Sequence, residues 1–152
     1  MAHFTFVVAT TVPPSEAFHY VADMRLFAAW DPFVVRAVEV VGPSPGPHSE
    51  VNLVFAGLGP FRTLPLHVTA FEPPERMVIE GHTRFVAVHD ELSVTPSPGG
   101  SQVRYSASVT LVGSLHWANR ALDVAAGPYG STAAKGLRAA LGGEIVAAGP
   151  TA

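Results

Sequence analysis

Residues 12–32 read VPPSEAFHYVADMRLFAAWDP, and this stretch decides how the first part of the chain folds. Ser15 is a candidate N-cap for a short helix. The apolar residues that follow recur at helical spacing: Ala17, Phe18, Val21 and Ala22. The run from Met24 to Trp30 predicts a second short helix, which ends at Asp31 because proline disfavours the helical conformation in the residue before it.

Strand-like sequence lies on both sides of these helices. Residues 3–12 are rich in β-branched and aromatic residues, which predicts a first strand. Six similar segments follow Phe33, separated by turns with glycine, proline or serine: 34–41, 49–57, 63–71, 76–83, 85–95 and 102–112. If successive segments pair as hairpins, one face is apolar and carries Leu53, Phe55, Leu64, Leu66, Val68, Met77, Ile79, Val88, Leu92, Val94, Tyr105, Val109 and Leu111.

The last long segment, residues 114–143, is the candidate cover for that face. It predicts a helix with a stripe of mostly small residues: Leu115, Ala118, Leu122, Ala125, Tyr129, Ala133, Leu137 and Ala140. We expect Pro128, after Gly127, to kink or divide this helix. Because an alanine-rich helix is too slim to fill the concave side of a long sheet, the pattern predicts a cavity for a ligand. Residues 143–152 read as a flexible tail after one domain spanning 3–142.

Composition excludes several classes of protein. The 152 residues are 48% hydrophobic and 14% charged, which argues against disorder. The net charge is −3 and Lys135 is the single lysine, so no basic cluster predicts nucleic-acid binding. There is no cysteine for a disulfide or a thiolate site. Without a signal-peptide pattern or a long apolar run, we expect a cytoplasmic protein with no stable membrane insertion.

The order of these elements, and several motifs, resemble a known superfamily. Residues 12–32 look like the N-terminal signature of the START-like polyketide cyclase/dehydrase superfamily (SRPBCC, Bet v 1-like), at Pro14, Glu16, Ala17 or Phe18, Val21, Asp23, Trp30 and Pro32. Residues 71–81 and 103–113 are also similar to it. The resemblance covers about residues 3–142 and implies the α+β helix-grip fold, in which a curved antiparallel sheet of six or seven strands wraps a long C-terminal helix. Similar members include ligand carriers, plant-hormone receptors and aromatase/cyclases, so the fold does not decide the function.

Two polar residues on the apolar face are candidates for chemistry. Asp90 lies between Val88 and Leu92, where burial of its carboxyl would raise the pKa and suit it to proton transfer or to holding a polar ligand group. The structural alternative is that it pairs with Arg36, Tyr105 or a helix residue. Tyr105 lies on the same face, and its phenol suits either a ligand contact or the core.

The histidines give weaker signals. His67, His82 and His89 fall on the opposite, solvated face of three strands, so we expect no metal site there. His116, at the start of the last helix, is either a proton-transfer group at the cavity entrance or simply exposed. Ser114 reads as the N-cap of that helix rather than as a nucleophile.

The loop at residues 56–62, AGLGPFR, lacks the spacing of a phosphate-binding loop. Its glycines and apolar tip suit a lid over a cavity entrance.

Three functions remain open at this point. The first is binding or transport of a small hydrophobic ligand, without a cofactor, by these residues: Trp30, Phe55, Leu66, Ile79, Asp90, Leu92, Tyr105, Leu122 and Tyr129. The second is a cyclase or dehydratase that uses Asp90, Tyr105 and His116, which requires at least two of them to converge on the cavity. The third is an interaction protein with a collapsed cavity and an exposed apolar patch. The sequence also leaves a homodimer open.

Overall fold

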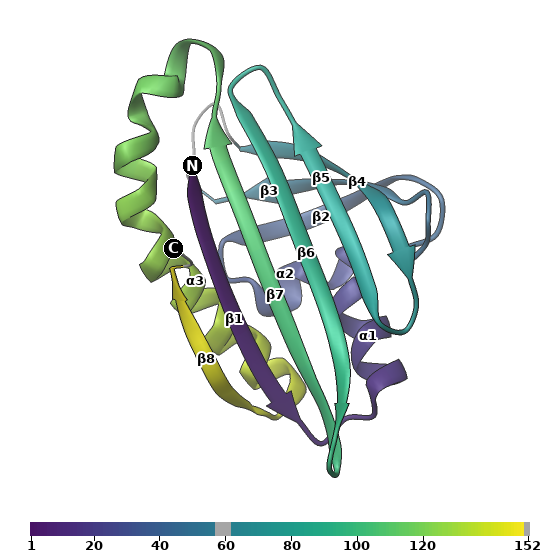
Figure 1. Cartoon of the computed structure of the whole chain (residues 1–152). Helices are drawn as coiled ribbons and strands as arrows, with labels where there is room; N and C mark the ends of the chain where they lie inside the picture. The colour runs from purple at the N-terminus through teal and green to yellow at the C-terminus, as the bar shows by residue number, and fades with distance from the viewer. Residues whose placement is uncertain (57–61, 151–152) are drawn as a thin grey trace.

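A computed structural model describes residues 1–56 and 62–150 (Figure 1). Its strands are β1 (Ala2–Thr10), β2 (Val34–Val41), β3 (Glu50–Phe55), β4 (Thr63–Glu72), β5 (Arg76–His82), β6 (Val86–Ser97), β7 (Gly100–Leu111) and β8 (Glu144–Pro150). They form one sheet in the order β2-β3-β4-β5-β6-β7-β1-β8, and each of these neighbouring pairs is antiparallel. The predicted run of hairpins is therefore confirmed from β2 to β7.

The sheet has eight strands, whereas six or seven were expected. Residues 144–150, which we expected to be part of a flexible tail, form β8 along the outer edge of β1, with Ile145 opposite Val8. Gly142 ends the preceding helix with a φ of 61°, a left-handed conformation that glycine adopts at low cost. The chain can therefore reverse direction directly after the helix and pair with β1.

The helices follow the predicted order, with differences at their ends. They are α1 (Pro14–Ala22), the 3₁₀ turn η1 (Met24–Leu26), α2 (Phe27–Trp30), the 3₁₀ segment η3 (Gly113–Ala118) and α3 (Asn119–Leu141). Ser15 was wrongly predicted as an N-cap, because Pro14 already occupies the first helical position, which suits a residue without an amide donor. Ser114 is not an N-cap either, since it lies within η3.

Pro128 does not divide the last helix, which runs unbroken as α3 from Asn119 to Leu141. A proline inside a helix removes the amide that would bond the carbonyl four residues earlier, here that of Val124. Val124 lies on the exposed side of the helix, where water can replace the missing donor. The predicted interruption of α3 is therefore limited to one missing hydrogen bond, and the helix continues past Pro128.

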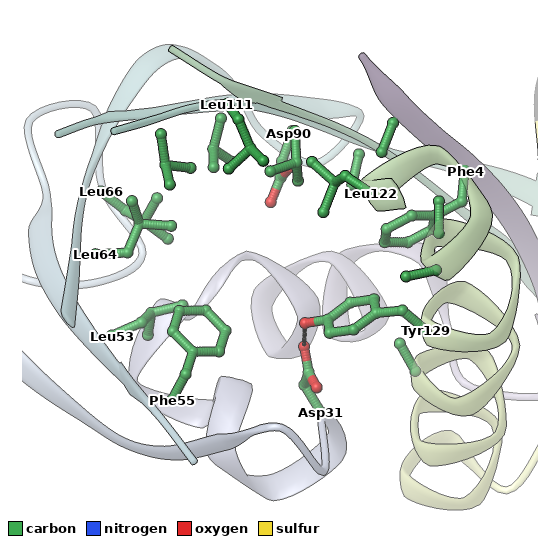
Figure 2. A pocket seen from close by; sticks show the side chains of 18 of the residues that line it. Phe4, Asp31, Leu53, Phe55, Leu64, Leu66, Asp90, Leu111, Leu122 and Tyr129 are labelled. Atoms are coloured by element: carbon green, nitrogen blue, oxygen red, sulfur yellow. Dashed lines mark hydrogen bonds between the residues drawn. The ribbon is translucent and has the colours of Figure 1, made fainter. Parts of the chain in front are cut away.

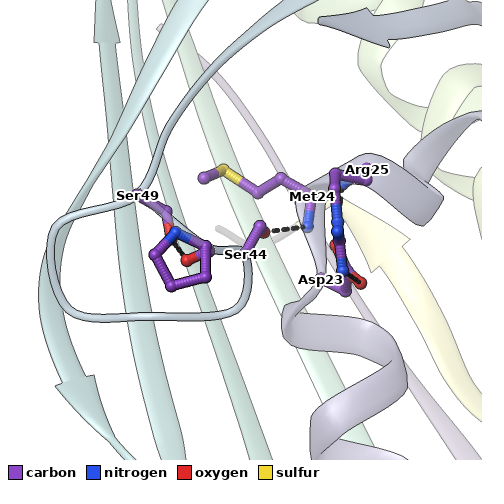
Figure 3. Close-up of polar contacts among 6 residues, drawn as sticks. Asp23, Met24, Arg25, Ser44 and Ser49 are labelled. Atoms are coloured by element: carbon purple, nitrogen blue, oxygen red, sulfur yellow. Dashed lines mark hydrogen bonds and ion pairs between the residues drawn. The ribbon is translucent and has the colours of Figure 1, made fainter. Parts of the chain in front are cut away.

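Polar contacts join the first helices to the β2–β3 connection (Figure 3). The Met24 amide donates to Oγ of the buried Ser44 at 3.0 Å. Asp23 accepts from both the backbone and the guanidinium of Arg25, with N···O distances of 2.8 to 3.0 Å. Ser49 donates to carbonyl oxygens of the same connection, at Pro43 and Gly46. Asp23, a residue of the N-terminal motif, therefore has a structural role in fixing the turn between the helices.

The concave face of the sheet is covered by helices, as Figure 1 shows. α3 packs mainly against β1 and β8, and α1 packs against β6 and β7. The apolar face predicted from sequence alternation is confirmed, with Leu53, Leu66, Met77, Ile79 and Leu92 all buried. Within the described ranges, no helix is both long and apolar enough to cross a membrane.

Candidate functional site

A cavity of about 500 Å³ lies between the concave face of the sheet and α3 (Figure 2). The sheet contributes side chains from β1, β3, β4, β6 and β7, and the helices contribute side chains from α2 and α3. The lining is mostly aliphatic and aromatic: Ala2, Phe4, Phe27, Trp30, Asp31, Leu53, Phe55, Thr63, Leu64, Leu66, Thr83, Val86, Val88, Asp90, Tyr105, Ala107, Val109, Leu111, Ala118, Ala121, Leu122, Ala125, Ala126, Tyr129 and Ala133. The small side chains of α3 leave this space open, as its alanine-rich stripe predicts.

Seven of the nine residues predicted to touch a ligand line this cavity: Trp30, Phe55, Leu66, Asp90, Tyr105, Leu122 and Tyr129. Ile79 and Leu92 do not line it. Both side chains are fully buried in the packed core, although they share the apolar face with the cavity residues. Sequence alternation identifies the face of a strand but not which part of that face is covered by a helix, and here α1 covers part of β6.

Asp90 and Tyr105 form a buried pair at the cavity wall. β6 and β7 pair with Asp90 opposite Ala107, and the Tyr105 hydroxyl donates to Asp90 Oδ2 at 2.6 Å. Burial raises the pKa of Asp90 from 3.8 to about 7, although the hydrogen bond from Tyr105 opposes this effect. Burial and the nearby carboxyl hold the pKa of Tyr105 well above its ordinary value, so the phenol stays protonated. Of the three partners considered for Asp90, the structure selects Tyr105.

A second carboxyl–phenol pair, Asp31 and Tyr129, lies on the opposite side of the cavity from Asp90 (Figure 2). The Tyr129 hydroxyl of α3 donates to Asp31 Oδ2 at 2.7 Å, as Figure 2 shows, and the Phe33 amide donates to Asp31 Oδ1 at 2.9 Å. Burial raises the pKa of Asp31, and the bonds from Tyr129 and Phe33 oppose this. The Asp31 carboxyl also raises the pKa of Asp90, because a nearby like charge disfavours ionisation. This pair links the end of α2 to α3.

Two buried polar atoms of lining residues lack a hydrogen-bond partner within the described chain, namely Trp30 Nε1 and Asp90 Oδ1. Trp30 packs edge-on against Tyr105, with ring centroids 5.6 Å apart. Both unpaired atoms therefore belong to direct neighbours of Tyr105. Buried polar groups are nearly always paired in proteins, so Trp30 and Asp90 each keep one hydrogen-bonding atom without a partner among the described residues.

Sequence reasoning missed Asp31 as a site residue. It reads as the residue that ends a helix before proline, and nothing nearby in the sequence indicates its partner, because Tyr129 lies 98 residues further on. Phe4 and Phe27 were also missed as lining residues, although strand and helix periodicity place both on inward faces.

The histidines lie away from the cavity lining. His116 is exposed within η3, so of the three proton-transfer candidates only Asp90 and Tyr105 converge. On the convex face, β5 places Glu80 between His67 and His89, and His89 Nδ1 lies 3.0 Å from Glu80 Oε1. Within residues 1–56 and 62–150, no group of three His, Cys, Asp or Glu side chains is arranged to hold a metal ion. The lid predicted at residues 56–62 lies, except for its two end residues, outside the described part of the chain.

Solved structures with a similar fold include a START superfamily protein and an aromatase/cyclase. A START superfamily protein from Mycobacterium smegmatis aligns with a TM-score of 0.70 and 15% identity, over 93% of this chain and 98% of that one. The Zhui aromatase/cyclase from a Streptomyces species aligns with a TM-score of 0.75 and 11% identity, over 92% and 93%. These identities show a shared fold and no more. A search of the curated proteins found no match.

A family model matches most of the chain. The model described as polyketide cyclase/dehydrase and lipid transport matches residues 1–142, which include β1 to β7 and all of α3. The resemblance seen in the sequence motifs is therefore confirmed, and the chain belongs to the polyketide cyclase/dehydrase and lipid transport family.

Proposed function

We propose that this protein binds or carries a small hydrophobic molecule, such as a lipid, a polyketide or a similar metabolite, in the cavity between the sheet and α3. The observation that carries the proposal is the cavity itself. Its volume of about 500 Å³ falls in the range of small-molecule sites, and aliphatic and aromatic side chains dominate its lining. The family description, which includes lipid transport, supports the same reading.

The first test is native mass spectrometry of the purified protein, followed by extraction of any bound molecule. Retention of an apolar molecule supports the proposal. In parallel, titration with N-phenyl-1-naphthylamine, a neutral probe that fluoresces in apolar surroundings, measures whether the cavity is accessible. Failure of the unaltered protein to bind either an endogenous molecule or this probe contradicts the proposal.

A cavity-filling variant shows where the probe binds. Ala125 lines the cavity from α3 but is partly open to solvent, so Ala125→Trp adds volume inside without repacking the core. Ala140→Trp is the matched control, because Ala140 lies exposed on the same helix and does not line the cavity. We expect Ala125→Trp to reduce the amount of bound probe at least several-fold and Ala140→Trp to leave it unchanged.

A cyclase or dehydratase activity is the second candidate. It is favoured by the convergence of Asp90 and Tyr105 on the cavity, since a carboxyl with a pKa of about 7 can both accept and donate a proton near neutral pH. The test is incubation of the extracted molecule, or of aromatic polyketide mimics, with the protein. Loss of water or ring closure that Asp90→Asn abolishes, while binding persists, supports catalysis. An unchanged molecule supports binding alone.

A further inference from the structure

We propose that the bound molecule carries a neutral hydroxyl group that docks at Asp90, and that the cavity selects such an alcohol or phenol over a carboxylate of the same hydrocarbon shape. This inference rests on the proposed binding function and adds the chemical class of the ligand's polar end. Three properties of the lining carry it: the sign of its charges, the hydrogen bonds already made by its carboxyls, and the unpaired atoms beside Tyr105.

The charges of the lining disfavour an anion. Asp31 and Asp90 both line the cavity, and the lining residues in the described ranges include no lysine, arginine or histidine. A ligand carboxylate inside would have no cation to pair with and would face two acidic side chains. Burying an unpaired charge is costly, and a like charge nearby adds to that cost. Fatty acids and other anionic lipids are therefore poor candidates for this cavity.

The two carboxyls differ in what they can still accept. Asp31 has a donor on each oxygen, the Phe33 amide on Oδ1 and the Tyr129 hydroxyl on Oδ2. Asp90 receives one hydrogen bond, from Tyr105 to Oδ2, while Oδ1 is without a partner in the described structure. Asp90 is 8% exposed, and its carboxyl projects from β6 into the cavity (Figure 2). Asp90 is thus the lining carboxyl that still needs a donor.

Trp30 has the opposite need, because its indole N–H is a donor without an acceptor among the described residues. Its side chain lines the cavity and is 3% exposed. A hydroxyl group carries both functions that these atoms lack, because it has one donor, which Asp90 needs, and two lone pairs, which the Trp30 N–H needs. An ammonium group can satisfy only Asp90, and a carboxylate can satisfy only Trp30. Turning the Asp90 carboxyl about its Cβ–Cγ bond exchanges the two oxygens, so either can meet the ligand.

The test compares three probes with the same chain, namely 1-decanol, decylamine and decanoate, at about pH 8, where they are neutral, cationic and anionic respectively. Each competes with N-phenyl-1-naphthylamine for the unaltered protein, so the ranking does not depend on any variant folding. We expect 1-decanol to displace the fluorescent probe at a concentration at least about tenfold lower than either ionic probe.

Variants locate the selective group. Asp90→Asn is expected to weaken 1-decanol binding several-fold and to strengthen decanoate binding, because it removes a strong acceptor and a negative charge together. Asp123→Asn is the matched control, since Asp123 is exposed on α3 and is not among the residues that line the cavity, and it is expected to leave 1-decanol binding unchanged.

The outcomes separate the two proposals. Equal binding of the three probes, or preference for decanoate, overturns the hydroxyl assignment while leaving the binding function standing. Preference for decylamine also overturns it and indicates a cationic end group instead. If N-phenyl-1-naphthylamine does not bind and no endogenous molecule is retained, the binding function fails, and that result is seen before any competitor is added.

Discussion

Gly136 of α3 packs directly against the carbonyl oxygen of Trp30, and a Cβ at this position would collide with that oxygen. This close approach brings α3 onto the end of α2, where Trp30 and Asp31 turn into the cavity. A second glycine, Gly130, makes a similar contact with the ring of Phe4 on β1, where a Cβ would lie 2.7 Å from a ring carbon. The second half of α3 is therefore fixed by glycines as well as by its buried leucines.

Alanine substitutions at two glycines of α3, Gly136 and Gly127, are expected to differ in their effect on stability. Gly136→Ala forces the backbones of α2 and α3 apart, so we expect it to lower the free energy of unfolding by about 1–3 kcal/mol. A Cβ at Gly127 meets nothing beyond its chain neighbours, but Pro128 follows, and a residue with a Cβ is disfavoured in the helical conformation before proline. This cost offsets the gain in helix propensity, so we expect Gly127→Ala to change the free energy of unfolding by less than about 1 kcal/mol. Urea denaturation of both variants checks this. Equal effects would mean that α3 does not approach Trp30 as described.

The strand β8 gives a second pair of variants. Ile145 is partly buried against the core opposite Val8, while its neighbour Val146 is 58% exposed. We expect Ile145→Ala to cost about 1–2 kcal/mol of unfolding free energy and Val146→Ala less than about 0.5 kcal/mol. Thermal and urea unfolding of the two variants are the measurements. If residues 144–150 were a frayed tail instead, both substitutions would be silent.

Local patterns predict most of this fold because its sheet has one buried face. Alternation fixes which side of each strand points inward, and hairpins keep successive strands adjacent, so β2 to β7 follow from the sequence. β8 was missed because its pairing partner is the first strand of the chain, and no local feature of EIVAAGP indicates that edge. The predicted start of the first helix was wrong because Pro14 occupies the first helical position, so Ser15 lies inside the helix and is not its N-cap.

The candidate site was predictable to the extent that its residues break a local pattern. Asp90 is a charged residue on an apolar face, and Tyr105 is a polar aromatic residue on the same face, so the alternation singles out both. Asp31 depends on a contact with Tyr129 that only the folded chain makes. The division of the inward face between open cavity and packed core, which separates Asp90 from Ile79, depends on where the helices lie.

The Asn119 side chain ties the start of α3 to β7, which predicts a role for Asn119 in ligand release. Its amide accepts from the Leu111 amide at 2.8 Å and donates to the Leu111 carbonyl at 2.9 Å. Asn119→Ala frees the first turns of α3, which line the cavity through Ala121 and Leu122. We expect a loss of about 1–2 kcal/mol in unfolding free energy and a several-fold faster release of bound probe in stopped-flow dilution.

Thr132→Ala is the control for this variant. The Thr132 hydroxyl donates to the Pro128 carbonyl within α3 and is exposed, so its loss does not loosen the helix from β7. The release rate of this control should match that of the unaltered protein. Equal release rates in Asn119→Ala and Thr132→Ala would argue against a tether at the start of the helix.

The raised pKa of Asp90 predicts that stability falls as pH rises. In the unfolded chain this carboxyl loses its proton near pH 3.8, whereas in the folded protein its pKa is about 7. Between these values the folded state retains a proton that the unfolded state has released, so the free energy of unfolding decreases with pH and levels off above about pH 7. At 1.36 kcal/mol per pKa unit, the full decrease is roughly 4 kcal/mol.

Asp90→Asn isolates this contribution, because asparagine keeps the shape and cannot ionise. We expect the variant to be nearly as stable as the unaltered protein at about pH 4 and more stable at about pH 8, measured by urea denaturation across the range. Asp31, whose pKa is also raised, should leave a smaller decrease with pH in the variant. If the two stability curves run parallel, the Asp90 carboxyl is not desolvated by the cavity wall, which contradicts its raised pKa.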